Sequence, residues 1–168
     1  IARMPARVPS ELVLAIARRE SEFDPYVISP VGARGLMQVM PKTAKEMADR
    51  VGLRYSQKRL ETDWAYNARI GITYLEELAE RYGGNPVLMS VAYNAGPSRA
   101  DRWIELLGDP RKDAVNVIDW IEMAPFQETR NYIMRVTESL PIYQARLGKP
   151  IALKSFEAML KGSSLSLR

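Results

Sequence analysis

The sequence has 168 residues, the length of one ordinary domain, and its 26% charged and 46% hydrophobic residues are typical of a globular chain rather than a disordered one. It contains no His and no Cys, which excludes Ser-His-Asp, Cys-His, His-zinc and thiolate chemistry. The net charge of +4 comes from Lys and Arg scattered among acidic residues, which argues against a nucleic-acid groove, and no apolar run approaches the roughly 20 residues of a membrane-spanning helix.

Helical periodicity dominates the chain, and no stretch alternates long enough to predict a sheet, so the fold is expected to be mainly α. Residues 1–8 lack an initiator Met and an apolar signal core, which indicates a lead-in from a larger protein. Residues 9–150 are expected to form one catalytic domain, and residues 151–168 a C-terminal tail with a frayed end at Ser163-Ser164.

Start and stop signals place seven helices along this domain. Loop composition from Ser29 to Gly35 predicts a turn-rich connection after the first of them. The first expected helix starts at Pro9 and stops at Pro25. The other six run from Pro41 toward Val51, from Asp63 to Arg81, from Asn85 to the Gly96-Pro97 stop, from Ser98 to Leu107, from Val115 to Ile121, and from Phe126 to Arg146 with a break or kink at Pro141.

One carboxylate in the first helix is expected to point inward. At about 100° per residue, Glu20 shares an apolar stripe with Leu12, Val13 and Ile16, whereas Glu11, Arg18 and Glu22 project to the opposite side. A carboxyl group there either pairs with a cation, reaches water at the helix end, or stays desolvated with a raised pKa. The last case is what a general acid needs in order to protonate a glycosidic oxygen.

Three motifs then occur in a fixed order. The first combines Ala17-Arg18-Arg19-Glu20-Ser21-Glu22-Phe23-Asp24-Pro25 with Ser29-Pro30-Val31-Gly32-Ala33-Arg34-Gly35-Leu36-Met37-Gln38-Val39-Met40-Pro41; the others are Ala92-Tyr93-Asn94-Ala95-Gly96-Pro97 and Ala124-Pro125-Phe126-Gln127-Glu128-Thr129-Arg130-Asn131-Tyr132. Together they closely resemble the catalytic domain of the soluble lytic murein transglycosylases, over residues 9–148. The resemblance implies a lysozyme-like, two-lobed helical domain with a central substrate groove.

The resemblance also implies a role for each matching residue. Glu20 matches the catalytic acid/base, and no metal or cofactor is expected. The side chains expected to contact substrate are Ser29, Gln38, Met40, Tyr93, Asn94, Glu128 and Tyr132. From the residues alone, Ser29 is explained as a turn residue and Met40 as core filler. Tyr93 is explained as a half-buried aromatic, and Asn94 as part of a helix terminus capped by a left-handed Gly96. Glu128 is explained as an anion that stabilises the first turn of a helix.

The family's reaction cleaves the β-1,4 bond between N-acetylmuramic acid and N-acetylglucosamine without water and closes a 1,6-anhydro ring, which makes the enzyme a lyase. The resemblance implies peptidoglycan strands as the partner and a bacterial periplasm or cell envelope as the location. Two alternatives remain open. One is a lysozyme-like muramidase, a hydrolase in which Glu128 or Asp24 positions a water. The other is a non-catalytic glycan-binding domain, which the intact Glu20 disfavours.

Overall fold

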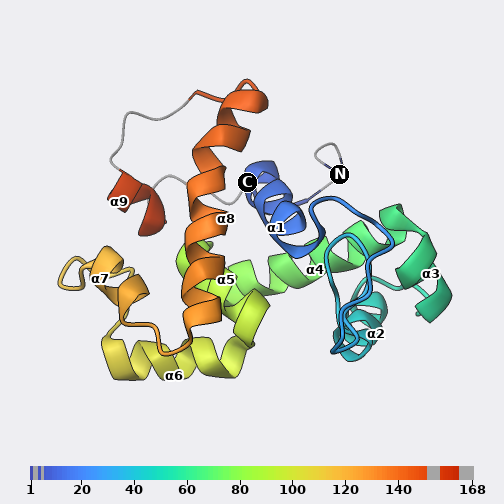
Figure 1. The fold of residues 1–168 in the computed structure, drawn as a ribbon, viewed down its shortest axis with the longest axis horizontal. Helices are drawn as coiled ribbons and strands as arrows, with labels where there is room; N and C mark the ends of the chain where they lie inside the picture. Colours follow the sequence, from blue (N-terminus) through green and yellow to red (C-terminus); the bar gives the residue numbers. More distant parts are fainter. Residues whose placement is uncertain (2–3, 5, 151–155, 163–168) are drawn as a thin grey trace. The chain divides into compact units, whose positions relative to one another are not determined.

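The computed structural model describes residues 1, 4, 6–150 and 156–162 (Figure 1). These residues are mainly helical, and the only β pairing within the described ranges is a pair of isolated bridges, Ile28 with Arg34 and Arg34 with Val39. The expected mainly α class is therefore confirmed. The chain divides into two compact units, Ile1–Glu77 and Leu78–Arg168.

The first unit holds three helices and the start of a fourth. Its α3 was not expected from the sequence, because this short polar helix buries only Leu60 and so lacks an apolar stripe. Its one local signal is Ser56, whose hydroxyl accepts a hydrogen bond from Arg59 N at 3.3 Å and so caps the helix. The helices are α1 Ser10–Ser21, α2 Pro41–Arg50, α3 Gln57–Thr62 and α4 Trp64–Tyr82, the last of which continues into the second unit.

Helix α1 follows the predicted stripe, with one exception. Leu12 and Ile16 are fully buried and Val13 nearly so, as expected. Glu11, which the pattern places opposite the stripe, is nevertheless buried as well, with only 4% of it exposed. Residues 11–13 and 15–17 are all buried, which means that α1 is covered on nearly every side over its first two turns. A helical wheel gives the direction of each side chain but not what covers that direction.

Helix α1 also ends earlier than Pro25 requires. Glu22 caps it in the left-handed conformation with φ 53°, and its N–H donates to Arg18 O. Phe23 follows with φ 68°, so two successive residues other than glycine adopt a positive φ directly after the helix. The chain therefore turns sharply within three residues of Glu20.

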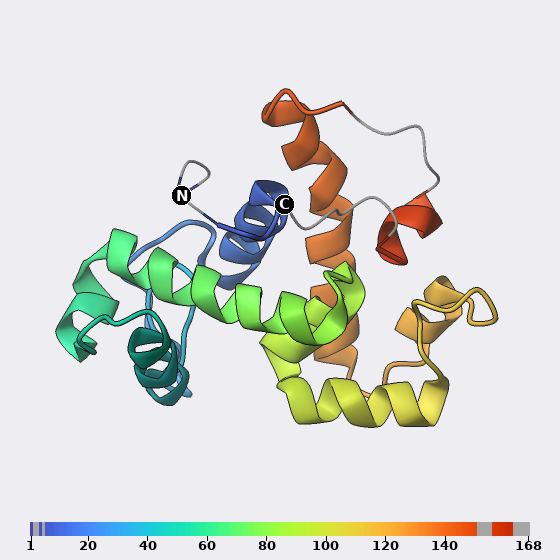
Figure 2. The same ribbon diagram turned by 180° about the vertical axis from the view of Figure 1, so that it is seen from behind.

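In the second unit, α8 packs against α5, and α5 also packs against α6 (Figures 1 and 2). The short helix α7 contacts both α8 and α9. Trp120, Leu88, Ile133 and Val136 are fully buried in this unit. The bounds are α5 Pro86–Ala95, α6 Pro97–Leu107, α7 Val117–Glu122, α8 Gln127–Arg146 and α9 Phe156–Leu160.

Helix α8 was expected to be either broken or kinked at Pro141, and it is not broken there. The helix contains Pro141 and continues to Arg146. Proline removes one backbone hydrogen bond, but buried Leu140 and Tyr143 on either side keep the helix packed across it. Tertiary burial thus outweighs the local penalty.

Part of the expected C-terminal tail forms α9 and is packed onto the second unit. Leu160 is fully buried, and its carbonyl accepts a hydrogen bond of 2.9 Å from Asn85 Nδ2. The rest of the tail, including Ser163-Ser164, lies outside the described residues. Among the helices that are described, none combines the length and apolarity needed to cross a membrane.

Candidate active site

Glu20 is the penultimate residue of α1 and is half-buried. Its neighbour Ser21 ties this helix end to the following loop, because Ser21 Oγ lies 2.7 Å from Leu36 O and 3.2 Å from Ala17 O. The carboxyl group therefore sits at a helix end that is anchored, one residue away, to the second half of the first motif. Apolar packing precedes it and a sharp turn follows it.

Ser29 closes the first turn of that loop. Its backbone N–H donates to Ala33 O, and its hydroxyl oxygen accepts from Ala33 N, both at 3.0 Å. The structure thus gives Ser29 the turn role that its sequence position before Pro30 suggests. Both bonds leave the hydroxyl proton available for a further acceptor.

Gln38 and Met40 lie at the far end of the same loop. Gln38 adopts a left-handed φ of 46°, and its amide Nε2 donates to Val27 O and Gly35 O, each at 2.9 Å. The amide nitrogen therefore holds the loop together, and the amide oxygen is the atom left to accept a hydrogen bond from a ligand. Met40 is 42% exposed, so it is not core filler.

In the second unit, the second and third motifs meet through one side-chain hydrogen bond. Thr129 Oγ1, at the start of α8, lies 2.8 Å from Asn94 Oδ1, at the end of α5. Thr129 is 2% exposed, so this bond is shielded from water. Tyr93 beside it is half-buried on α5. The structure thus brings together two motifs that are more than 30 residues apart in the sequence.

The turn between α5 and α6 depends on Gly96. It has φ 93° and ψ 150°, so the expected left-handed helical cap is wrong in detail. This conformation is nearly exclusive to glycine, and it allows Gly96 to end α5 while Pro97 begins α6 directly. The expected stop at Gly96-Pro97 is therefore also a start.

The third motif presents one polar and one buried side chain from α8. Glu128 is exposed in the first helical turn, whereas Tyr132 is 3% exposed. Just before them, Phe126 packs edge-to-face on the buried Trp103 with a centroid distance of 5.5 Å. The guanidinium of Arg99 lies over the ring of Phe126, with its Cζ 5.2 Å from the ring centroid, and donates a hydrogen bond to Ala95 O. Arg99 thus links the ends of the second and third motifs.

Two residues that matter to this geometry were not singled out by the sequence. Thr129 fell within the third motif without an assigned role, and Asn67 lies on α4 outside all three motifs. Asn67 is fully buried and makes three hydrogen bonds to backbone atoms, two of them in residues 34–37 and one at Leu60. A polar residue in an otherwise apolar helical face is the signal that could have identified it.

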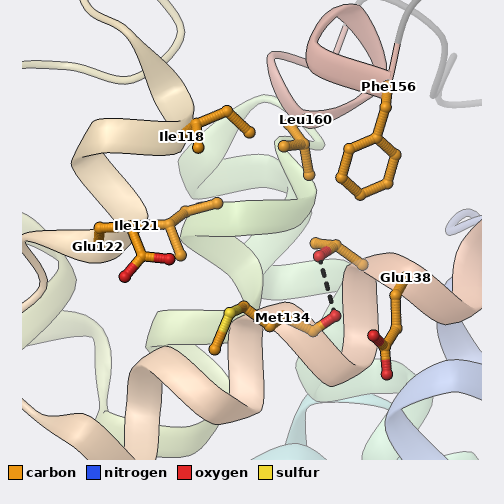
Figure 3. A pocket seen from close by; sticks show the side chains of 8 residues that line it. Ile118, Ile121, Glu122, Met134, Glu138, Phe156 and Leu160 are labelled. Carbon is orange, nitrogen blue, oxygen red and sulfur yellow. Dashed lines mark hydrogen bonds between the residues drawn. The ribbon is translucent and has the colours of Figure 1, made fainter.

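A surface pocket of about 240 Å³ lies in the second unit between α7, α8 and α9 (Figure 3). Its walls are mostly apolar, with two carboxylates on them, and it includes none of the predicted site residues. It is lined by Ile118, Ile121, Glu122, Met134, Thr137, Glu138, Phe156 and Leu160. Within the described ranges, no group of three or more acidic side chains lies close enough to hold a metal ion.

Comparison with known protein families matches the Transglycosylase SLT domain to residues 2–116. The soluble lytic murein transglycosylase of Escherichia coli K12 is 37% identical over 152 residues, which cover 89% of this chain and 23% of that protein. The membrane-bound lytic murein transglycosylase C of Mannheimia succiniciproducens is 30% identical and matches 82% of this chain and 43% of its own length. This chain therefore spans less than half of either relative.

Solved structures give the same result for the fold. The 70 kDa soluble lytic transglycosylase of Escherichia coli superposes with a TM-score of 0.79 at 36% identity, over 88% of this chain and 24% of that one. An inactive glutamate-to-glutamine mutant of the lytic transglycosylase Slt from Pseudomonas aeruginosa superposes with a TM-score of 0.75 at 40% identity, over 84% of this chain and 22% of that one. A complex of the 70 kDa soluble lytic transglycosylase with bulgecin A superposes with a TM-score of 0.78 at 37% identity, over 88% of this chain and 24% of that one.

Proposed function

This chain belongs to the Transglycosylase SLT domain family, and we propose that it cleaves peptidoglycan as a lytic transglycosylase with Glu20 as its acid and base. The observation that carries the proposal is the position of Glu20. It is half-buried at the end of a helix whose first two turns are covered, and it is anchored to the loop that bears the other first-motif residues. Partial removal from water favours the protonated form of a carboxyl group, as a general acid requires.

The proposed reaction uses one carboxyl group twice. Glu20 first gives its proton to the oxygen between N-acetylmuramic acid and N-acetylglucosamine, and the bond from that oxygen to muramyl C1 breaks. The resulting carboxylate then takes the proton of the muramyl C6 hydroxyl, and the oxygen of that hydroxyl attacks C1. The products are a glycan with a free 4-hydroxyl and a 1,6-anhydromuramic acid end, and Glu20 is again protonated. No water is consumed.

The remaining first-motif side chains support substrate binding in this proposal. Ser29 has a hydroxyl proton to donate, Gln38 an amide oxygen to accept, and Met40 an exposed apolar face suited to a sugar ring. In the second unit, the proposed glycan contacts are Tyr93, Asn94 and Glu128, whereas Tyr132 is only 3% exposed, which leaves little of its side chain to contact a glycan. The bond between Thr129 and Asn94 fixes the amide of Asn94, which supports this assignment.

The hydrolase alternative needs a second carboxylate that activates water. Asp24 is poorly suited, because its Oδ1 already accepts the backbone N–H of Tyr26 at 2.9 Å in a local turn. Glu128 is exposed and remains the candidate for that role. The nature of the product therefore distinguishes the two reactions. Because the substrate is cell-wall peptidoglycan, we also propose a periplasmic or cell-envelope location, with this chain as the catalytic part of a longer protein.

Glu20→Gln tests the assignment of the acid. The amide keeps the shape of the side chain but neither gives nor takes the proton, so turnover should fall by about 10²- to 10⁴-fold or more. The matched control is Glu22→Gln, which changes an exposed carboxylate two residues away and should leave turnover within about twofold. Retention of more than about a tenth of the parent rate by Glu20→Gln would exclude Glu20 as the catalyst.

A further inference from the structure

Asn67 on α4 holds the first-motif loop with every polar group of its amide. Its Nδ2 donates to Arg34 O at 2.8 Å and to Leu60 O at 3.0 Å, and its Oδ1 accepts from Met37 N at 2.9 Å. The side chain is fully buried. A buried amide with both donors and its acceptor satisfied fixes its partners strongly, because no water replaces a lost bond.

The loop and α4 approach one another so closely that two glycines are required. A Cβ added to Gly35 would lie 2.5 Å from Asn67 Nδ2, and a Cβ added to Gly71 would lie 2.5 Å from Met37 Sδ and 2.8 Å from Met37 Cβ. A Cβ essentially never lies this close to a non-bonded heavy atom, so an added methyl group would force a neighbouring atom to shift. The segment from Arg34 to Met37 is therefore pressed onto one face of α4 and held there by Asn67.

This segment connects Asn67 to the catalytic acid. Asn67 fixes Arg34 and Met37, and between these two residues lies Leu36, whose carbonyl accepts the hydroxyl of Ser21 at 2.7 Å. Ser21 follows Glu20 directly in the sequence. Gln38 follows the segment at its other end and is tied back to Gly35 O. A shift of the segment therefore moves both the anchor of Glu20 and the position of Gln38.

We propose that Asn67 is a positioning residue for the transglycosylase reaction: through Leu36 and Ser21 it fixes Glu20, and through the loop it fixes Gln38 against the glycan. The inference rests on the proposed function, since it assigns Asn67 to the same site. Displacing a catalytic group by about 1 Å costs up to about 10²-fold in rate, so the effect is measurable even though Asn67 does not touch the substrate.

Tyr66 supplies a matched control on the same helix. Its hydroxyl accepts from Ser56 N and donates to Arg54 O, both at 3.2 Å, and so anchors a different loop. Tyr66→Phe removes two part-buried hydrogen bonds, and neither of them involves residues 34–38. Asn67→Ala and Asn67→Asp are compared with it, the Asp variant keeping the volume and the acceptor for Met37 N but losing both donors.

The test measures kcat and KM on uncrosslinked glycan strands, with each variant assayed well below its own unfolding temperature. We expect both Asn67 variants to raise KM several-fold and to lower kcat/KM by about tenfold or more, with Tyr66→Phe within about twofold of the parent. A purely structural role would lower the folded fraction, which reduces apparent kcat and leaves KM unchanged. An unchanged KM in the Asn67 variants would overturn the proposal, and so would equal losses of kcat/KM in the Asn67 variants and Tyr66→Phe. Failure of both Asn67 variants to fold, while Tyr66→Phe folds normally, would also overturn it.

Two further readouts separate this proposal from the proposed function. Hydrogen exchange of the Met37 amide should accelerate in Asn67→Ala, which removes its acceptor, and not in Tyr66→Phe, whatever reaction the protein catalyses. Ser21→Ala should lower kcat, and adding it to Asn67→Ala should cost less than the sum of the single losses. Strict additivity or a protected Met37 amide would refute the positioning path, whereas absence of anhydro products from the parent would refute the reaction.

Discussion

Gly35 is the position where one added methyl group has the sharpest expected effect. A Cβ there would lie 2.5 Å from Asn67 Nδ2 and 2.9 Å from the backbone oxygen of Leu60, and the residue has φ +68°. The backbone oxygen cannot rotate away as the end of a side chain could. Gly35→Ala therefore has to displace either the loop or the amide of Asn67.

The magnitude follows from two separate terms. The left-handed backbone costs a residue with a Cβ about 1–2 kcal/mol, and overpacking a tight site costs about 1–3 kcal/mol. The free energy of unfolding should thus fall by about 2–5 kcal/mol, which lowers Tm by about 4–20 °C in a chain of this length.

Gly52 isolates the first of these terms, the cost of the left-handed backbone. Its φ of +66° is nearly the same, but an added Cβ would meet nothing within 4 Å. Gly52→Ala should therefore cost only the backbone term, about 1–2 kcal/mol, or about 2–8 °C in Tm. Thermal unfolding followed by far-UV circular dichroism compares the two variants. Equal losses of Tm would refute the close approach of the loop to α4.

Three further predictions concern the second unit. Asn85→Ala removes the cap of α5 and the hydrogen bond to α9, so the free energy of unfolding should fall by about 1–3 kcal/mol in denaturant titration; a loss below about 0.5 kcal/mol would show that neither bond matters. Thr129→Val removes the hydrogen-bond donor to Asn94 and should weaken glycan binding, which is measured in a Glu20→Gln background to prevent turnover. Thr129→Val alone should still form the same product as the parent. Unchanged glycan affinity would count against the role of Asn94. The side-chain hydrogen bonds of Arg111 lower the pKa of Asp109, so the pair stabilises the fold above the ordinary aspartate range and loses that contribution as the pH falls through the lowered pKa. Asp109→Asn should therefore reduce stability at neutral pH by at most about 1 kcal/mol and leave it unchanged in strong acid, and a constant difference across pH would contradict this.

Helix starts and stops were the most predictable features. Pro41 and Gly52 mark the bounds of α2, and Asn85 with Pro86 begins α5, because these residues act through their own backbone or over one helical turn. Helix α3 and the burial of Glu11 were not predictable in the same way. The formation of α3 and the burial of Glu11 both depend on which other segments of the chain pack against them. The periodic pattern of one helix carries no information about such packing.

The candidate site likewise combines residues that the sequence singled out with contacts that it did not predict. Motif order located Glu20, Gln38 and Asn94, but not the bonds that hold them. The hydroxyl of Thr129 bonds to a residue 35 positions away, and the amide of Asn67 bonds to loop residues 30 and 33 positions away, so spacing along the chain gives no hint of these pairings. Their polar side chains in apolar surroundings were the available signal.

The residue that divides the two possible reactions is Glu128. In the transglycosylase reaction it only contacts substrate, so Glu128→Gln should weaken binding and still yield the anhydro product. In a hydrolase it would activate water, and the same change would abolish turnover as completely as loss of Glu20.

The masses of the muropeptides released from peptidoglycan test the central claim most directly. A single Glu acting as acid and then as base requires a nucleophile from the substrate, so the products should end in 1,6-anhydromuramic acid. They should be lighter by one water than hydrolysis products and should resist reduction by borohydride. Reducible muropeptides that have gained a water would make this enzyme a hydrolase and contradict the account.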